Sequence, residues 1–236
     1  MDKQTVIFKD LGIIEYKEAW DFQEELLQEN VRIKTTIRNG ETESPTLKTQ
    51  HYFLLCEHPP VYTLGKSGKK EHVLMSDEEL EQNNIGFFNT NRGGDITFHG
   101  LQQVVGYPIL DLEKYQTDIG IYLRNLEEVV ILTLAEYGIK GERSKGETGV
   151  WIEPGIKGRE RKLCAIGVRC SRWITMHGFA LNVNTDLDYF NNIIPCGIND
   201  KQVGSIEKEL GHAVDYNEAK EKIKKNFEKV FDSVLQ

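Results

Sequence analysis

Two side chains in this sequence, one amine and one thiol, are of the types needed for covalent acyl transfer. Lys162 and Cys196 lie 34 positions apart, so only the fold can bring them together. A cysteine attacks an acyl group as its thiolate, and a nearby ammonium group lowers the pKa of the thiol. The residues alone leave a second interpretation open, in which Cys196 is a small buried apolar side chain and Lys162 a solvated charge.

The residues next to Cys196 favour a turn that presents the thiol. Pro195 restricts Ile194 to extended conformations, and Gly197 lets the chain turn away without the steric hindrance of a Cβ. Such a turn can place backbone N–H groups beside the sulfur, where they would stabilise an oxyanion. The sequence around Cys196 is therefore compatible with a nucleophile, although it does not require one.

Several segments occur in the order found in one enzyme family. They are EHPPVYTLG at 57–65, RGGDITFHG at 92–100, Tyr107-Pro108, TGVW at 148–151, KLCAIGVR at 162–169, WITMHGFALNV at 173–183, PCG at 195–197 and VGSIEKELG at 203–211. Together they resemble the lipoate-biosynthesis octanoyltransferases, or lipoyl(octanoyl) transferases, of the biotin/lipoate protein ligase-like superfamily. The resemblance runs from about residue 10 to residue 211. One departure is Leu101-Gln102, which stands where the family usually has Pro-Gly and leaves the shape of that loop open.

The resemblance implies a reaction and a set of site residues. The reaction is the transfer of an octanoyl group from octanoyl-acyl carrier protein to a lysine of a lipoyl domain, through a thioester on Cys196, with Lys162 as the catalytic partner. The implied substrate-binding residues are Arg92, Gly93, Gly94, Asp95, Ile96, Thr97, Phe98, His99, Ala165, Ile166, Gly167, Gly178, Phe179 and Ala180. Apolar residues Val61, Tyr62, Leu64, Phe98 and Phe179 are candidates for a tunnel that holds the acyl chain.

The resemblance also implies the partners. The acceptors are lipoyl domains of the E2 subunits of 2-oxoacid dehydrogenases and the H protein of glycine cleavage, and neither a cofactor nor a metal is expected. Exchange of one thioester for another, followed by amide formation, needs no ATP. Two alternatives remain open: an ATP-dependent lipoate or octanoate ligase or lipoyl-domain amidotransferase of the same fold, and a non-catalytic module that binds lipoyl domains or carrier protein.

Composition excludes some other classes of function. The net charge of −8 argues against a general nucleic-acid-binding protein, which needs an excess of lysine and arginine. Cationic residues concentrate instead at 157–172, which is either a solvated face or a docking patch for an acidic carrier protein. The four cysteines form no CxxC pair. Without a signal sequence or a long apolar run, they indicate a cytoplasmic protein with reduced thiols.

Familiar motifs for other chemistry are incomplete. Gly65-Lys66-Ser67 lacks the earlier glycine of a phosphate loop, because Pro60 stands in its place. The spacing of cysteine and histidine gives no tetrahedral zinc set. His99 and His177 could act in acid–base chemistry or form structural hydrogen bonds, and we assign neither a catalytic role.

The pattern of elements predicts an α+β fold in a single domain spanning 1–236, with a mostly antiparallel, mixed sheet flanked by helices, as in biotin and lipoate ligases. Apolar periodicity predicts helices at 16–30, 115–137 and 216–235, and a capped short helix from Ser76. Strands are predicted at 4–8, 51–56, 61–64, 104–110, 149–153, 162–169 and 174–183. Two more, 86–89 and 95–99, flank Arg92-Gly93-Gly94, which taken alone is typical of a tight hairpin turn.

Overall fold

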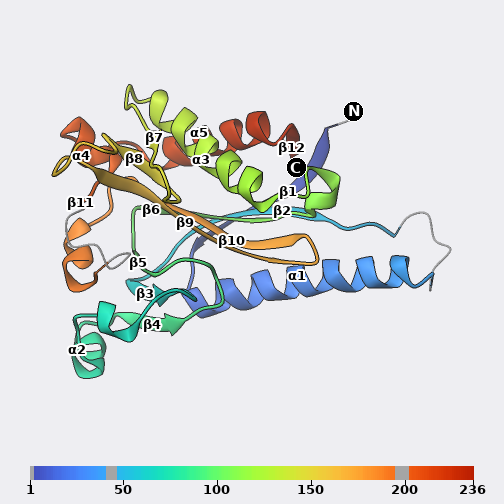
Figure 1. Ribbon diagram of the computed structural model, residues 1–236, viewed down its shortest axis with the longest axis horizontal. Helices are drawn as coiled ribbons and strands as arrows, with labels where there is room; N and C mark the ends of the chain where they lie inside the picture. Colours follow the sequence, from blue (N-terminus) through green and yellow to red (C-terminus); the bar gives the residue numbers. More distant parts are fainter. Residues whose placement is uncertain (1–2, 41–46, 195–201) are drawn as a thin grey trace.

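A mixed β-sheet with helices on both faces forms the body of the protein (Figure 1). A computed structural model describes residues 3–40, 47–194 and 202–236. One long helix, α1 (Tyr16–Arg38), covers one face, and α3 (Ile119–Ala135) and α5 (Tyr216–Val230) pack together on the other. This arrangement confirms the expected α+β class.

The larger sheet is mostly antiparallel, as expected. Its order is β12 (Ser233–Leu235), β1 (Gln4–Ile13), β2 (His51–Glu57), β6 (Gln103–Ile109), β10 (Ile174–Asn182), β9 (Arg161–Ser171), β8 (Val150–Ile152) and β7 (Glu142–Arg143). The pairs of β1 with β12 and with β2 are parallel, while the neighbours from β2 to β7 pair antiparallel. A short strand, β11 (Gln202–Val203), runs parallel to the start of β9.

A second, smaller sheet carries the Arg92-Gly93-Gly94 turn. Its order is β4 (Gly86–Asn89), β3 (Val61–Leu64) and β5 (Ile96–His99), with β3 parallel to β4 and antiparallel to β5. The turn therefore does not close a hairpin, because β3 lies between the two strands that the turn connects. The turn contacts the larger sheet instead, where the amide of Gly93 donates to the carbonyl of Val168 on β9.

A side-chain N-cap begins each α-helix in the described residues except α1, where Glu15 forms no such cap. Ser76 and Glu79 form the expected capping box at the start of α2 (Asp77–Gln82). Asp118 caps α3, and Asp215 caps α5, each through a carboxylate that accepts from backbone N–H groups. Ser205 caps the short helix α4 (Ile206–Leu210). Three 3₁₀ turns complete the set: η1 (Lys70–His72), η2 (Leu112–Lys114) and η3 (Leu187–Asn192).

Several predicted boundaries are wrong, among them the end of the first strand, which continues beyond residue 8 to Ile13. The first helix continues beyond residue 30 to Arg38, and α3 begins only at Ile119, after its cap. The last helix ends at Val230, and Asp232 takes a left-handed φ of 45°. The chain then adds β12 beside β1, with Gln4 opposite Ser233, where the sequence predicted more helix.

Apolar side chains fill both faces of the large sheet. One cluster joins α3 and α5 to the sheet through Phe53, Leu126, Phe179 and Phe227, with the rings of Phe53 and Phe227 stacked at 4.1 Å. A second cluster joins α1 to the other face. Within the described ranges, no helix combines the length and hydropathy needed to cross a bilayer.

Candidate active site

A cavity of about 630 Å³ opens where the small sheet meets β9 and β10. The turn at 92–95 and strand β5 form one wall, and β9, β10 and β6 form another. Its lining includes thirteen of the fourteen predicted substrate-binding residues, together with Lys162. Those thirteen are Arg92, Gly93, Gly94, Asp95, Ile96, Thr97, His99, Ala165, Ile166, Gly167, Gly178, Phe179 and Ala180.

Phe98, the fourteenth, lies outside the cavity lining. Its ring stacks on Tyr189 at 4.5 Å and meets Phe190 edge-on at 5.5 Å. Successive side chains of a strand point to opposite faces, so Phe98 packs beneath β5 while Thr97 and His99 line the cavity. The other tunnel candidates divide similarly: Phe179 lines the cavity, whereas Val61, Tyr62 and Leu64 pack into the core of the small sheet or beside it.

Glycines allow the turn at 92–95 to dock against β9. A Cβ on Gly167 would lie 2.7 Å from the carbonyl oxygen of Gly93, which is closer than real Cβ atoms come. Gly94 has a φ of +88°, in the region that favours glycine. The buried guanidinium of Arg92 then holds the turn, since Nη2 donates to the carbonyl and hydroxyl of Thr63 at 2.6 and 2.9 Å.

Lys162 lies on β9 at the edge where three strands meet. Its ammonium nitrogen sits 4.6 Å from the centre of the Trp151 ring, a cation–π contact between β9 and β8. On its other side, Val203 of β11 pairs with Lys162, and the amide of Gly204 donates to the Lys162 carbonyl at 3.0 Å. Packing on both sides therefore fixes the backbone that carries this amine.

Cys196 lies outside the described residues, as do its neighbours from 195 to 201. The described chain approaches that stretch from two sides. Ile194 donates its amide to the carbonyl of His72 at 2.9 Å, and Gln202 begins β11 beside Arg161. Phe190 and Gln202 line the same cavity as Lys162.

The two histidines considered in the sequence both line the cavity and are buried. Burial lowers the pKa of His177 to about 3 and that of His99 well below its usual value. The amide oxygen of Asn91 lies 2.7 Å from Nε2 of His177, and that of Gln103 lies 2.9 Å from Nδ1 of His99. Both rings are therefore neutral hydrogen-bonding groups at physiological pH.

His177 also has an unusual backbone. Its φ of +58° falls inside strand β10, where non-glycine residues rarely adopt left-handed values. The rotated amide donates to Oε1 of Gln23 on α1 at 2.9 Å instead of to a strand. Residues held in such conformations cluster at active sites and ligand sites, and His177 lines the cavity.

Sequence reasoning missed a buried group of aromatic and polar side chains around His99. Tyr16 of α1 lines the cavity and stacks on His99, with ring centres 5.8 Å apart. Tyr107 and Asn182 also line it, and Asn182 accepts from the Gln103 amide at 2.8 Å. Tyr107 and Asn182 lie in segments that resemble the family, whereas Tyr16 was interpreted only as part of an amphipathic helix. No pattern in the sequence indicates that this helix lies beside the cavity.

Three arginines of the cationic segment at 157–172, Arg159, Arg161 and Arg169, form internal ion pairs. Arg161 contacts Glu209 and Glu153 at 2.6 and 2.7 Å, and Arg169 contacts Glu24 at 2.6 Å. The side-chain hydrogen bond to Glu209 is the main cause of the raised pKa of Arg161. These arginines tie β9 to α1, α4 and the end of β8.

Known proteins resemble this chain along nearly its whole length. The family profile described as lipoyl protein ligase A/B catalytic domain matches residues 15–228. A protein of Christiangramia forsetii named octanoyltransferase is 55% identical over 237 residues, covering 100% of this chain and 99% of that protein. An octanoyltransferase of Flavobacterium psychrophilum is 56% identical over 233 residues, covering 98% and 99%.

Among solved structures, a bi-partite lipoate protein ligase from Thermoplasma acidophilum shares the fold. It superposes with a TM-score of 0.63 at 15% identity, covering 100% of this chain and 86% of that one. At such low identity the likeness concerns the fold alone, and it confirms the expected lipoate-ligase-like architecture.

Proposed function

This chain belongs to the lipoyl protein ligase A/B catalytic-domain family, and from that premise we propose that it is an octanoyltransferase of protein lipoylation. The observation that carries the proposal is its 55% identity, along its whole length, to a protein named octanoyltransferase. The enzyme is an acyltransferase whose acceptors are lipoyl domains. Our proposal extends to the donor, an octanoyl-acyl carrier protein, and to the residues that perform the transfer.

The first half-reaction acylates the enzyme. The Cys196 thiolate attacks the thioester carbonyl of the donor, a new carbon–sulfur bond forms, and the carrier thiol leaves with the electrons of the old one. Lys162, when protonated, lowers the pKa of the attacking thiol and can give a proton to the departing thiolate. One thioester replaces another, so the step is close to balanced in free energy.

The second half-reaction releases the product. The lysine amine of a lipoyl domain attacks the octanoyl-Cys196 thioester, an amide bond forms, and the Cys196 thiolate is regenerated. Lys162, when neutral, accepts the proton that the incoming amine loses. Because an amide is more stable than a thioester, this step drives the transfer without ATP.

The cavity supports this proposal through its shape and lining. Val105, Ala165, Phe179 and Ala180 give it an apolar interior, and Lys162 lines it beside Trp151. We assign the octanoyl chain to the space between β9–β10 and the turn at 92–95. There Gly93, Gly94 and Gly167 let backbone approach the chain closely, and Ile96, Thr97, His99, Ile166 and Gly178 complete the walls.

The decisive experiment is a reconstituted transfer. The protein is incubated with octanoyl-carrier protein and an apo lipoyl domain without ATP, and the products are weighed by mass spectrometry. We expect an octanoylated lipoyl domain and, when the acceptor is omitted, an octanoyl adduct on the enzyme. Cys196→Ala should abolish both, and full activity in that variant would overturn the mechanism.

The assigned role of Lys162 has its own measurement. Lys162→Ala should slow acylation and raise the pH at which Cys196 is alkylated by iodoacetamide, whereas Lys157→Ala, on the exposed loop after β8, should leave both unchanged. An unaltered alkylation profile in Lys162→Ala would remove Lys162 from the mechanism.

The alternative functions give different products in the same assay. A ligase would octanoylate the lipoyl domain from free octanoate and ATP, without carrier protein and without need of Cys196. An amidotransferase would use an octanoylated lipoyl domain as its donor. A binding module would bind a partner in stoichiometric amounts without turnover.

A further inference from the structure

We propose that the basic loop at 65–70, with Lys145 across the cavity, is the docking surface for an acidic acyl carrier protein. The inference rests on the proposed function and names the surface that receives its donor. Arg159, Arg161 and Arg169, which suggested a docking patch in the sequence, form ion pairs with Glu153, Glu209 and Glu24. Three of the cations in that segment are therefore already paired within the protein, and the lysines of the loop at 65–70 are the better candidates for an acidic partner.

The loop carries free positive charge. Lys66, Lys69 and Lys70 are exposed. Within the described ranges, Lys66 and Lys69 have no ion-pair partner, and Lys70 meets only the exposed Asp77 at 3.4 Å. The chain as a whole has a net charge of −8, so these lysines form a local positive patch. Such a patch attracts an acidic protein and steers its approach.

The loop also lies directly on the cavity wall. Three successive amides donate to the turn at 92–95: Gly65 to the carbonyl of Asp95 at 3.1 Å, Lys66 to that of Arg92 at 3.0 Å, and Ser67 to that of Gly94 at 3.0 Å. Arg92, Gly94 and Asp95 all line the cavity. A protein bound to this loop therefore stands at the place where its acylated arm has to enter.

Close packing gives the loop a fixed shape. A Cβ on Gly65 would lie 2.3 Å from the carbonyl oxygen of Gly94, and one on Gly68 would lie 2.3 Å from a methyl carbon of Leu64. The amide of Gly68 donates back to the Gly65 carbonyl. The lysines consequently extend from an ordered backbone, which lowers the entropic cost of docking.

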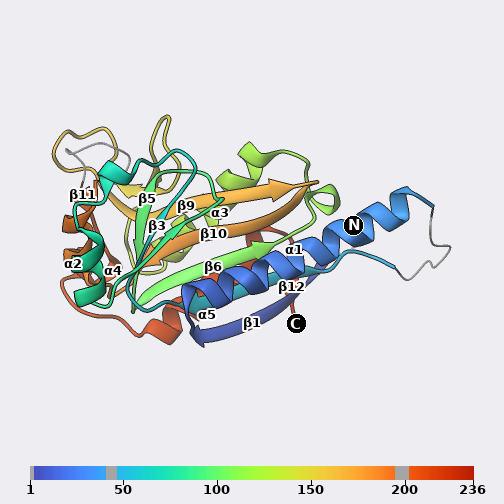
Figure 2. The ribbon, with the colours of Figure 1, turned by 90° about the horizontal axis from the view of Figure 1, so that it is seen from below.

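Two neighbours complete the surface. Leu74, a large apolar side chain that is 55% exposed, follows the loop and is held by its amide to the carbonyl of Asn192 at 2.9 Å. Lys145 is exposed on the loop between β7 and β8, next to Gly146, which lines the cavity. Both loops lie at the same end of the molecule (Figures 1 and 2). An apolar contact inside a charged rim is typical of a protein interface.

The test separates docking from catalysis. Lys66→Glu/Lys69→Glu is compared with Lys9→Glu/Lys229→Glu, which changes net charge equally at exposed positions on β1 and α5. Each is assayed with octanoyl-carrier protein and with octanoyl-pantetheine, a donor without the acidic protein. We expect KM for the carrier to rise about tenfold or more in the loop variant only, with octanoyl-pantetheine unaffected.

Binding of the carrier protein is measured separately, by fluorescence anisotropy at low and high salt. Wild-type and control proteins should bind with a strong salt dependence that the loop variant loses. Equal binding of the carrier protein by all three proteins would overturn the docking surface. So would a loop variant in which KM rises for the lipoyl domain and not for the carrier protein. If wild-type protein binds the carrier but transfers nothing, the proposed function fails while the docking surface stands.

Discussion

The hydroxyl of Tyr107 donates a hydrogen bond of 2.7 Å to Nε2 of His58, beneath the cavity. The other ring nitrogen, Nδ1, lies 2.7 Å from the carbonyl oxygen of Ile14, and a carbonyl can only accept. Nδ1 therefore carries the proton, Nε2 is the acceptor, and the ring is neutral. Burial lowers the pKa of His58 to about 4, because the charged form would lose its hydration.

Buried neutral histidines make the stability of the fold depend on pH. The pKa of His51 is also lowered to about 4, that of His177 to about 3, and that of His99 well below its usual value, in each case chiefly by burial. At pH between these values and the unfolded pKa of about 6.5, the unfolded chain binds more protons than the folded one. The stability that the neutral histidines contribute is fully present above the unfolded pKa of about 6.5, and it is lost as the pH falls towards their folded pKa values.

We therefore expect the free energy of unfolding to decrease from pH 6.5 towards pH 4, by up to about 1.4 kcal/mol per pH unit for each such histidine. Urea denaturation at a series of pH values measures the slope. His51→Gln should make it shallower, while His212→Gln, at an exposed position, should leave it unchanged. A flat profile through this range would contradict the neutral assignment.

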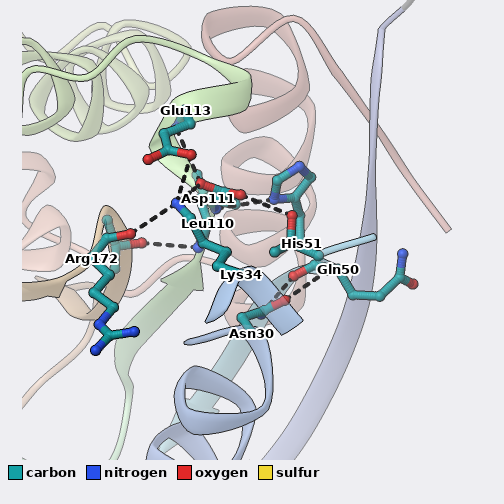
Figure 3. Close-up of polar contacts among 10 residues, drawn as sticks. Asn30, Lys34, Gln50, His51, Leu110, Asp111, Glu113 and Arg172 are labelled. Atoms are coloured by element: carbon teal, nitrogen blue, oxygen red, sulfur yellow. Dashed lines mark hydrogen bonds and ion pairs between the residues drawn. The ribbon is translucent and has the colours of Figure 1, made fainter. Parts of the chain in front are cut away.

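A second buried polar group joins α1 to the far end of the sheet (Figure 3). Lys34 contacts Asp111 at 2.8 Å and Glu113 at 3.0 Å, and donates to the carbonyl of Arg172 at 2.8 Å. Asp111, only 2% exposed, also accepts from Thr49 at 2.9 Å. This group ties together segments from four distant parts of the chain.

Asp111→Ala should destabilise the protein by about 3–5 kcal/mol, because it leaves the Lys34 ammonium largely buried without its principal partner. Replacing both residues, as Lys34→Met/Asp111→Leu, should recover part of that loss. Lys17→Ala breaks an exposed pair with Asp21 and should cost less than about 1 kcal/mol. Urea denaturation of the three variants makes the comparison, and an equal effect of Asp111→Ala and Lys17→Ala would show that burial of the pair is unimportant.

Local patterns predicted much of the fold. The apolar spacing through Leu126, Val130 and Leu134 identified α3, and the run at 104–110 identified the buried strand β6. The ends of elements were less predictable. Ser233 to Leu235 continue a helical pattern in sequence, but pairing with β1 at the opposite terminus satisfies their backbone hydrogen bonds.

The candidate site was predictable only where residues lie in recognisable segments. The turn at 92–95 and Lys162 were found in this way, and both line one cavity. Tyr16 was not, because its stacking on His99 depends on how α1 crosses the sheet. Ion pairing of Arg161 with Glu209 is likewise a tertiary contact, so the sequence showed the charge of that segment but not its partners.

Two neighbouring glycines should respond differently to the same substitution. A Cβ on Gly167 would lie 2.7 Å from the carbonyl oxygen of Gly93, whereas one on Gly93 would lie 3.4 Å from that of Val168, an ordinary contact. Gly167→Ala should displace the turn at 92–95 and raise KM for the octanoyl donor about tenfold or more, since roughly 1.4 kcal/mol of lost binding suffices. Gly93→Ala should change KM less than about threefold, within roughly 0.7 kcal/mol. Steady-state kinetics with octanoyl-pantetheine measure KM for both variants. Equal changes in KM would contradict the close contact between Gly167 and the Gly93 carbonyl.

Small side chains on three adjacent strands should set the length of the acyl chain. Ala180 pairs with Ala165 on β9 and Val105 on β6, and all three line the cavity. Ala165 lies three positions beyond Lys162, which at about 3.4 Å per residue places this group roughly 10 Å along the strand from the Lys162 backbone. A larger side chain here would occupy the space assigned to the distal carbons.

Ala180→Val should therefore lower kcat/KM for octanoyl donors about tenfold while changing that for hexanoyl donors little, since each methylene is worth about 1–3 kcal/mol in an apolar pocket. Ala19→Val, at a buried α1 position in the same apolar cluster, is the control for overpacking and should leave the ratio of the two donors unchanged. The ratio is measured with both acyl-pantetheines in competition, which removes differences in active enzyme concentration. An unaltered ratio in Ala180→Val would place the end of the acyl chain elsewhere in the cavity.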